Sequence, residues 1–186
     1  DFPRVQLVGG VSADAGLAIP DFRAGERMFQ LLTQVARRAG RGERSGRVIL
    51  QTYSPNEPIL QWALHHDYEG FREVERRQRK QHGYPPFTRM VEVELSSKNE
   101  REVRQKGDQL ANRLRATMKK EEQEELLGPA EAPIYMVKQR YRIRLLYKGL
   151  RAALFRTKVQ QALEQTGLLS NSTVQVKIDV DPQAML

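Results

Sequence analysis

Two adjacent prolines, Pro85 and Pro86, divide this chain of 186 residues more firmly than any other feature of its sequence. They follow a charged run with the composition of a helix. Neither proline is compatible with a helix interior, because proline lacks the backbone N–H and its ring clashes with the preceding turn. The chain is also long enough for two small domains. We therefore predict one domain over residues 1–66, a connector helix over 67–83 and a second domain over 84–186.

The first domain alternates strand and helix signals, which is typical of α/β proteins. The apolar run Val5–Val11 predicts a buried strand, and Arg47–Thr52 predicts a second one. Between them, Pro20 and Phe22 flank Asp21, whose carboxylate suits the start of a helix. The sequence therefore predicts a strand–helix–strand unit before the connector.

After the prolines, the predicted elements follow the order strand, helix, strand, strand, helix, strand. This is the order of the split βαβ, or ferredoxin-like, arrangement, an α+β fold with two helices on one face of an antiparallel sheet. The elements are expected at Thr88–Ser96, Asn99–Lys120, Ile134–Val137, Tyr141–Tyr147, Leu150–Gln165 and Val174–Val180. Gly167 is expected to cap the second helix.

The formal net charge of +8 is concentrated in the last part of the chain. Residues 1–66, 67–134 and 135–186 carry net charges of +2, 0 and +6. An unpaired positive field favours a polyanion such as nucleic acid, and the attraction weakens with salt. A net charge that merely keeps the protein soluble is the alternative.

Several kinds of site are excluded or unsupported by the residues present. The chain has no cysteine, which excludes a disulfide scaffold, a thiolate zinc site, an iron–sulfur cluster and a cysteine nucleophile. His65-His66-Asp67 lacks metal-ligand spacing, and we expect no metal here. There is no phosphate-binding loop of the Walker A type, so a complete nucleotide-hydrolysing site is absent. No apolar run approaches the ~20 residues of a membrane span.

Three arginines alternate along one predicted strand, and we call them the arginine stripe. They are Arg140, Arg142 and Arg144. The two-residue period of a strand puts them on one face, and Lys138 extends the row if the turn lies before it. Adjacent cations repel unless something anionic meets them. We interpret the stripe and Lys138 as a DNA-binding surface. The alternative is ion pairing with Glu92 and Glu94 on the first predicted strand.

A second basic cluster ends the helix of the first domain, in Gln34-Val35-Ala36-Arg37-Arg38-Ala39-Gly40-Arg41. Guanidinium groups bind phosphoryl oxygens in pairs and stabilise charge that develops during phosphoryl transfer. A solvated helix end, whose cations suit the helix dipole, is the alternative.

This cluster belongs to a series of motifs that resembles the primosomal protein N′ (PriA) family of bacterial replication-restart helicases. The early motifs are similar to helicase motifs V and VI: Asp1-Phe2-Pro3, Leu7-Val8-Gly9, Ala13-Asp14, Pro20-Asp21-Phe22-Arg23-Ala24, Glu26-Arg27 and Gln34–Arg41. The later ones are Tyr84-Pro85-Pro86-Phe87, Leu127-Gly128-Pro129-Ala130, Arg140-Tyr141-Arg142 and Ile178-Asp179-Val180-Asp181-Pro182. The similarity runs along the whole chain in the family's order.

The resemblance implies that residues 1–66 are the tail end of a RecA-like helicase lobe. It also implies that the second domain is similar in fold to a ribosomal protein of the small subunit. The parent protein would be an ATP-dependent 3′-5′ DNA helicase of the bacterial cytoplasm and nucleoid. It would use ATP and Mg, hold zinc outside this chain, and act with branched and single-stranded DNA, single-strand binding protein and primosome proteins. This chain alone is expected to bind no cofactor and to be inactive.

The resemblance also implies roles for single residues. In the motif VI pattern Q-x-x-G-R-x-x-R, Gln34 would bind nucleotide, while Arg38 and Arg41 would reach the ATP γ-phosphate, one of them as an arginine finger. Arg37 stands where the pattern has glycine. Gln139 likewise replaces a glycine that the family leads us to expect before the arginine stripe.

The last predicted helix is our candidate for docking single-strand binding protein, whose acidic and hydrophobic tail would suit a cation beside an apolar patch. Arg151 and Phe155 are the residues we expect to carry this contact. An RNA-binding or ribosome-associated ferredoxin-like module without helicase function is the alternative reading of the whole chain.

Overall fold

The computed structural model describes residues 6–38, 46–119, 124–170 and 173–185 and divides into two compact units. The first unit is Asp1–Gln78 and the second is Arg79–Leu186. The division falls inside helix α3 (Tyr68–Gln81), so the last turn of the connector helix belongs to the second unit. The double proline follows the end of this helix.

The first unit is built around a strand–helix–strand crossover. Strands β1 (Leu7–Gly10) and β2 (Arg47–Leu50) pair in parallel, and the short 3₁₀ helix η1 (Ala15–Ala18) and helix α1 (Ala24–Arg38) lie between them in the chain. Parallel neighbours require such a crossover. The expected helix start is present, because the Asp21 carboxylate accepts a hydrogen bond from the backbone N–H of Arg23 at 2.8 Å.

The core of the first unit joins α1 to α2 (Pro58–Leu64) and α3. Its buried residues are Met28, Phe29, Leu32, Leu60, Ala63 and Phe71. The rings of Phe29 and Phe71 stack with their centroids 4.3 Å apart. Phe71 is therefore the residue that docks the charged connector helix on its own unit.

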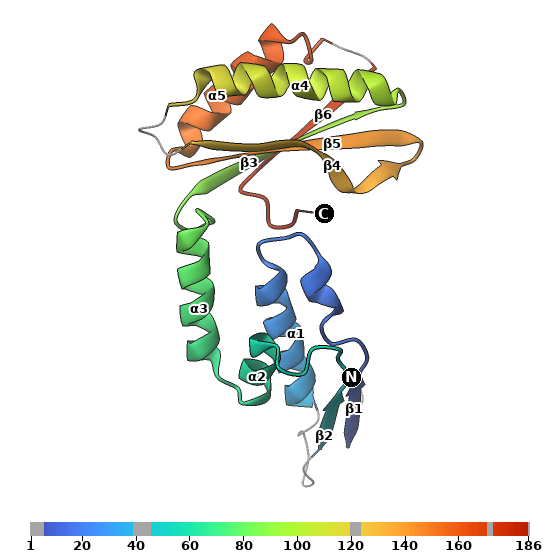
Figure 1. Cartoon of the computed structure of the whole chain (residues 1–186), viewed down its shortest axis with the longest axis vertical. Coiled ribbons are helices and arrows are strands. Elements are labelled where there is room, and N and C mark those ends of the chain that lie inside the picture. The colour runs from blue at the N-terminus through green and yellow to red at the C-terminus, as the bar shows by residue number, and fades with distance from the viewer. Residues whose placement is uncertain (1–5, 39–45, 120–123, 171–172, 186) are drawn as a thin grey trace. The chain divides into compact units, whose positions relative to one another are not determined.

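The second unit has the predicted split βαβ arrangement. Its elements are β3 (Arg89–Ser97), α4 (Glu100–Thr117), β4 (Glu125–Val137), β5 (Arg140–Gly149), α5 (Ala152–Gln165) and β6 (Gln175–Val180). The strands form an antiparallel sheet in the order β4-β5-β3-β6, and both helices cover the same face of it (Figure 1).

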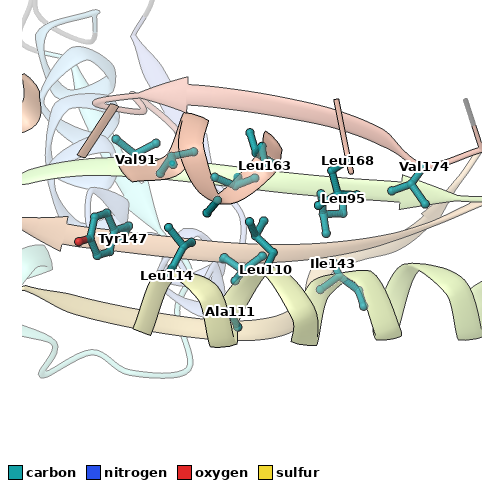
Figure 2. Close-up of a cluster of buried hydrophobic side chains, with 14 of the residues drawn as sticks. Val91, Leu95, Leu110, Ala111, Leu114, Ile143, Tyr147, Leu163, Leu168 and Val174 are labelled. Atoms are coloured by element: carbon teal, nitrogen blue, oxygen red, sulfur yellow. The ribbon is translucent and has the colours of Figure 1, made fainter. Parts of the chain in front are cut away.

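The core of the second unit fills the space between the sheet and its helices (Figure 2). The alternation in β3 turns Val91, Val93 and Leu95 toward the helices, where each is at most 1% exposed. Leu110 of α4 and Leu163 of α5 are fully buried against them. The opposite face of β3 and β5 is therefore the one that carries the arginine stripe.

Two details differ from the predicted elements. Strand β4 begins at Glu125, well before Ile134, because two register shifts break the alternation that a sequence pattern can detect. The β4–β5 turn is made by Lys138 and Gln139, so Lys138 stands in the turn rather than on the stripe strand. Gly167 follows α5 with a φ of 66°, which confirms it as the helix cap.

Candidate nucleic-acid interface

Two of the stripe arginines are neutralised by glutamates of the neighbouring strand. Antiparallel pairing of β3 with β5 sets Glu94 opposite Arg144 and Ser96 opposite Arg142. A guanidinium nitrogen of Arg142 lies 2.5 Å from the Glu94 carboxylate, and one of Arg144 lies 3.0 Å from it and 3.5 Å from Glu92. The side chains of Arg142 and Arg144 are only 15% and 11% exposed. The ion-pairing alternative therefore describes these two arginines.

The two glutamates respond differently to this surrounding. Burial opposes ionisation of Glu94, but hydrogen bonds from Arg142 and Arg144 outweigh it and hold the pKa of that carboxyl below its ordinary value. Burial raises the pKa of Glu92, with only partial opposition from Arg144. Glu94 is therefore the principal counter-ion of both arginines.

Backbone carbonyls occupy the remaining donors of the same arginines. Arg142 donates to the carbonyl oxygen of Ile134 at 3.2 Å, and Arg144 donates to that of Met185 at 2.7 Å. The first bond ties the irregular end of β4 to β5, and the second holds the C-terminal segment against the face of the sheet opposite the helices. Arg142 and Arg144 thus stabilise the fold of the second unit through their ion pairs and their hydrogen bonds to backbone carbonyls.

Arg140 differs from the other two because all of its partners are neutral. It donates to the hydroxyl of Ser96 at 3.2 Å and to the backbone carbonyls of Ser96 and Thr173 at 2.7 and 3.1 Å. Within the described parts of the chain, no carboxylate lies at ion-pair distance from it. Its position is fixed and its charge is not compensated.

Two lysines stand at the same end of the sheet as Arg140. Lys138 is in the β4–β5 turn, and Lys98 directly follows β3, whose last paired residue, Ser97, faces Tyr141 of β5. Both lysines are exposed, and no ion pair is formed by either among the residues that the structure describes. We call Lys98, Lys138 and Arg140 the hairpin-end cations.

Lys98 was absent from the predicted site. It is distant from Arg140 in the sequence, and only the pairing of β3 with β5 places it at the same end of the sheet. Only the residue-by-residue pairing of β3 with β5 shows that Lys98 lies near Arg140. Lys138, by contrast, was expected beside the stripe, and its predicted DNA contact stays a prediction.

The motif VI residues are only partly visible. Gln34 and Arg37 are exposed on the last turns of α1, which ends at Arg38. The side chain of Arg38 and the whole of Arg41 lie outside the described residues. Their proposed approach to ATP therefore remains a prediction.

The expected partner contact on α5 needs a correction. Phe155 is 1% exposed, and its ring packs on that of Tyr147 with centroids 4.4 Å apart, so it is a core residue and offers no surface. Lys158, on the same helix, is also buried, with its ammonium 2.5 Å from the fully enclosed carboxylate of Glu124. Arg151 is exposed just before the helix.

A groove of about 460 Å³ lies between α5 and the edge strand β6. It is lined by Val91, Arg156, Val159, Gln160, Leu163, Leu169, Ile178 and Val180. Ile178 and Val180 are 46% and 45% exposed, although they point to the helix-covered face, because α5 does not reach the sheet edge. Arg156 supplies a cation beside this apolar surface.

The second unit matches a known protein family along almost its whole length. Residues 80–183 fit the family described as primosomal protein N C-terminal domain. The chain belongs to the primosomal protein N (PriA) family.

Curated relatives agree with this membership over the whole chain. A replication restart protein PriA of Bacillus subtilis (strain 168) is 37% identical over 187 residues, which cover 100% of this chain and 23% of the relative. Those of a Synechocystis species and of Borreliella burgdorferi are 41% and 32% identical, over 98% and 100% of this chain and 21% and 28% of their own lengths. The chain thus spans about a quarter of the length of the relatives it matches.

The described helices include none that is long and apolar enough to cross a membrane. Nor do the residues with described positions contain a group of three or more His, Asp or Glu side chains arranged to hold a metal ion.

Proposed function

We propose that this chain acts in bacterial replication restart and that its second unit binds branched DNA through the hairpin-end cations. The relatives that match the whole chain carry the name of replication restart proteins. The single observation that carries the DNA contact is Arg140, whose guanidinium is held by three neutral acceptors and has no carboxylate at ion-pair distance among the described residues. Charge-assisted hydrogen bonds to phosphate are the strongest interaction open to such a group.

The proposed contact is with the DNA backbone. Arg140 is fixed by hydrogen bonds to Ser96 and Thr173, while Lys98 and Lys138 are exposed at the same end and form no ion pair with any described residue. Lysine and arginine contacts to phosphates position a protein on DNA without reading its sequence. Sequence-independent binding suits a protein that acts wherever a fork has stalled.

The first unit is proposed to be part of the second RecA-like lobe of a 3′-5′ helicase. Its parallel β1–α1–β2 crossover is compatible with such a lobe. Gln34, Arg38 and Arg41 would face ATP and Mg bound by another lobe, where an arginine stabilises the charge of the transferred phosphoryl group. Hydrolysis by the purified chain alone would contradict this division of the site.

The groove between α5 and β6 is the proposed site for the tail of single-strand binding protein. An acidic and hydrophobic peptide would place its apolar side chains against Ile178 and Val180 and a carboxylate beside Arg156. This assignment replaces Phe155, which is buried, with residues that line an open groove.

The DNA contact is tested by changing Lys138 and Arg140 to glutamine in the whole chain. Each phosphate contact contributes a salt slope of about 0.9, which amounts to about an eightfold affinity at 0.1 M salt. We expect the double variant to bind forked DNA about tenfold to sixtyfold more weakly, with a salt slope lower by about 1 to 2. Fluorescence anisotropy of a labelled fork at several salt concentrations measures both quantities.

The matched control changes Arg113 and Lys119 to glutamine. Arg113 lies on α4 and Lys119 just after it, and both side chains are exposed. Their replacement removes the same total charge at another place on the second unit. Equal weakening by both double variants would show a general charge effect and contradict the proposed contact. An unaltered chain that binds RNA of the same sequence as tightly as the fork would favour the RNA-binding alternative.

A further inference from the structure

The end of the β4–β5 hairpin exposes apolar side chains next to the hairpin-end cations. Ile134, Met136 and Val137 are 57%, 56% and 39% exposed. They occupy the last residues of β4, directly before Lys138. Figure 1 shows this hairpin at the end of the sheet near the start of α4. Exposed apolar side chains gathered at a strand end are a recognition feature more often than isolated ones are.

The hairpin end is held firmly although its apolar side chains are uncovered. Tyr135 donates from its hydroxyl to the Glu100 carboxylate at 2.9 Å, and its ring lies 5.3 Å from the guanidinium of Arg104. The Arg142 bond to the carbonyl of Ile134 fixes the strand from the other side. Ile134 and Met136, on either side of Tyr135, are thus presented from an anchored backbone.

The turn itself holds two side chains in a costly backbone conformation. Lys138 and Gln139 have φ values of 49° and 59°, the left-handed region in which glycine and asparagine are preferred for two-residue hairpin turns. Lys138, a hairpin-end cation, is thus held in a strained conformation, and backbone strain of this kind is often found at functional positions.

We propose that the hairpin end is a wedge for the junction of branched DNA. Ile134 and Met136 would pack against unstacked bases where the strands part, and Lys138 and Arg140 would hold the adjacent phosphates. Isoleucine and methionine are among the apolar residues that proteins insert at base steps, and cations beside them match the charge of the backbone. This inference rests on the proposed DNA binding and adds the property that tells a fork from a plain duplex.

A wedge predicts selectivity for the junction. Linear duplex offers phosphates but no unstacked bases, so the hairpin-end cations would bind it without help from the apolar side chains. A fork offers both, and affinity for it would exceed affinity for duplex of equal length by the contribution of Ile134 and Met136.

The test changes Ile134 and Met136 together to serine in the whole chain. We expect fork affinity to fall about tenfold, with duplex affinity and the salt slope unchanged, because no charge is altered. A 2-aminopurine at the junction should brighten when the unaltered chain binds, and this signal should be lost in the variant. Changing both residues to leucine should retain fork affinity and the signal, which separates the loss of apolar contact from misfolding.

The control changes Leu127 and Leu150 to serine, which are 39% and 51% exposed away from the hairpin end. An equal fall for fork and duplex, or no fall for either, would overturn the wedge while leaving the DNA contact intact. Failure of the unaltered chain to bind any DNA would overturn both proposals. A dimer of the unaltered chain that the serine variant converts to monomer would show that a second copy covers the hairpin end, and would also overturn the wedge.

Discussion

Replacement of Glu94 by glutamine tests whether the stripe arginines serve the fold or the DNA. The change keeps the shape of the side chain and removes the one carboxylate that Arg142 and Arg144 share. Glu92 remains, 3.5 Å from Arg144, but its pKa is raised by burial and it is the weaker counter-ion. The variant therefore leaves two largely enclosed guanidinium groups with little compensation.

The expected cost follows from the burial of the three groups. Removing one partner of a fully buried ion pair costs about 3–5 kcal/mol. Arg142, Arg144 and Glu94 retain side-chain exposures of 15%, 11% and 12%, so some solvent compensation remains. We expect a loss of about 2–3 kcal/mol at neutral pH, or about 10 °C or more in the melting midpoint of a unit of this size.

The loss should also depend on pH in a definite direction. The folded-state pKa of Glu94 is lowered, so its contribution to stability is present above the unfolded value of about 4.3 and disappears as the pH falls through the folded pKa. The difference between the two proteins should therefore narrow in acid. Thermal unfolding followed by circular dichroism at pH 7 and pH 4 measures it.

DNA binding supplies the result that would refute this reasoning. Because Arg142 and Arg144 are enclosed and bonded to backbone carbonyls, we expect fork affinity to stay within about twofold and the salt slope to stay unchanged. An affinity gain of about eightfold with a slope larger by about 1 would mean that a freed arginine meets phosphate. The stripe would then be a DNA surface that Glu94 restrains. A melting midpoint equal to that of the unaltered chain would contradict the ion-pair argument itself.

Two further changes test single contacts of the second unit. Burial destabilises the Glu124 carboxylate, but hydrogen bonds from Lys158 and Tyr147 stabilise it more and lower its pKa. Glu124→Gln should therefore lower the free energy of unfolding by about 3 kcal/mol at pH 7, and by progressively less below about pH 4.3. A decrease in the melting midpoint that does not shrink in acid would contradict this. Gln139→Gly should relieve the left-handed strain of the turn and raise stability by about 0.5–1 kcal/mol without weakening fork binding, and a lower midpoint would contradict the strain argument.

The order of elements in the second unit was predictable because its strands and helices have distinct periods. The alternation of apolar residues in β3 and β6 indicates strands, and the spacing of Leu110 and Leu114 indicates a helix. The prediction shortened β4 far more than any other strand of this unit, because its register shifts near Ala130 and Met136 interrupt the two-residue period. A bulged edge strand has no simple sequence pattern.

The candidate site was harder to predict than the fold. Strand period correctly assigned the stripe arginines to one face, but it could not choose their partners, since a shift of one residue in the pairing of β3 with β5 would turn Glu94 to the other face. Phe155 failed as a surface residue for a related reason. The sequence alone does not show whether Phe155 points to the buried or to the exposed side of its helix. Its packing on the ring of Tyr147 places it on the buried side.

The distribution of charge along the sequence overstated the field of the last part of the chain. Its net +6 includes four cations whose carboxylate partners lie in the formally neutral middle: Arg142, Arg144, Lys148 and Lys158. These partners, Glu94, Glu125 and Glu124, neutralise cations of the last segment instead of cations of the middle segment. Lys98 of the middle segment forms no ion pair with any described residue. The hairpin-end cations therefore come from both segments, at the end of the sheet where β3 and β4 end and β5 begins. A variant at Lys98 should weaken fork binding as much as one at Lys138, although the two residues are far apart in the sequence.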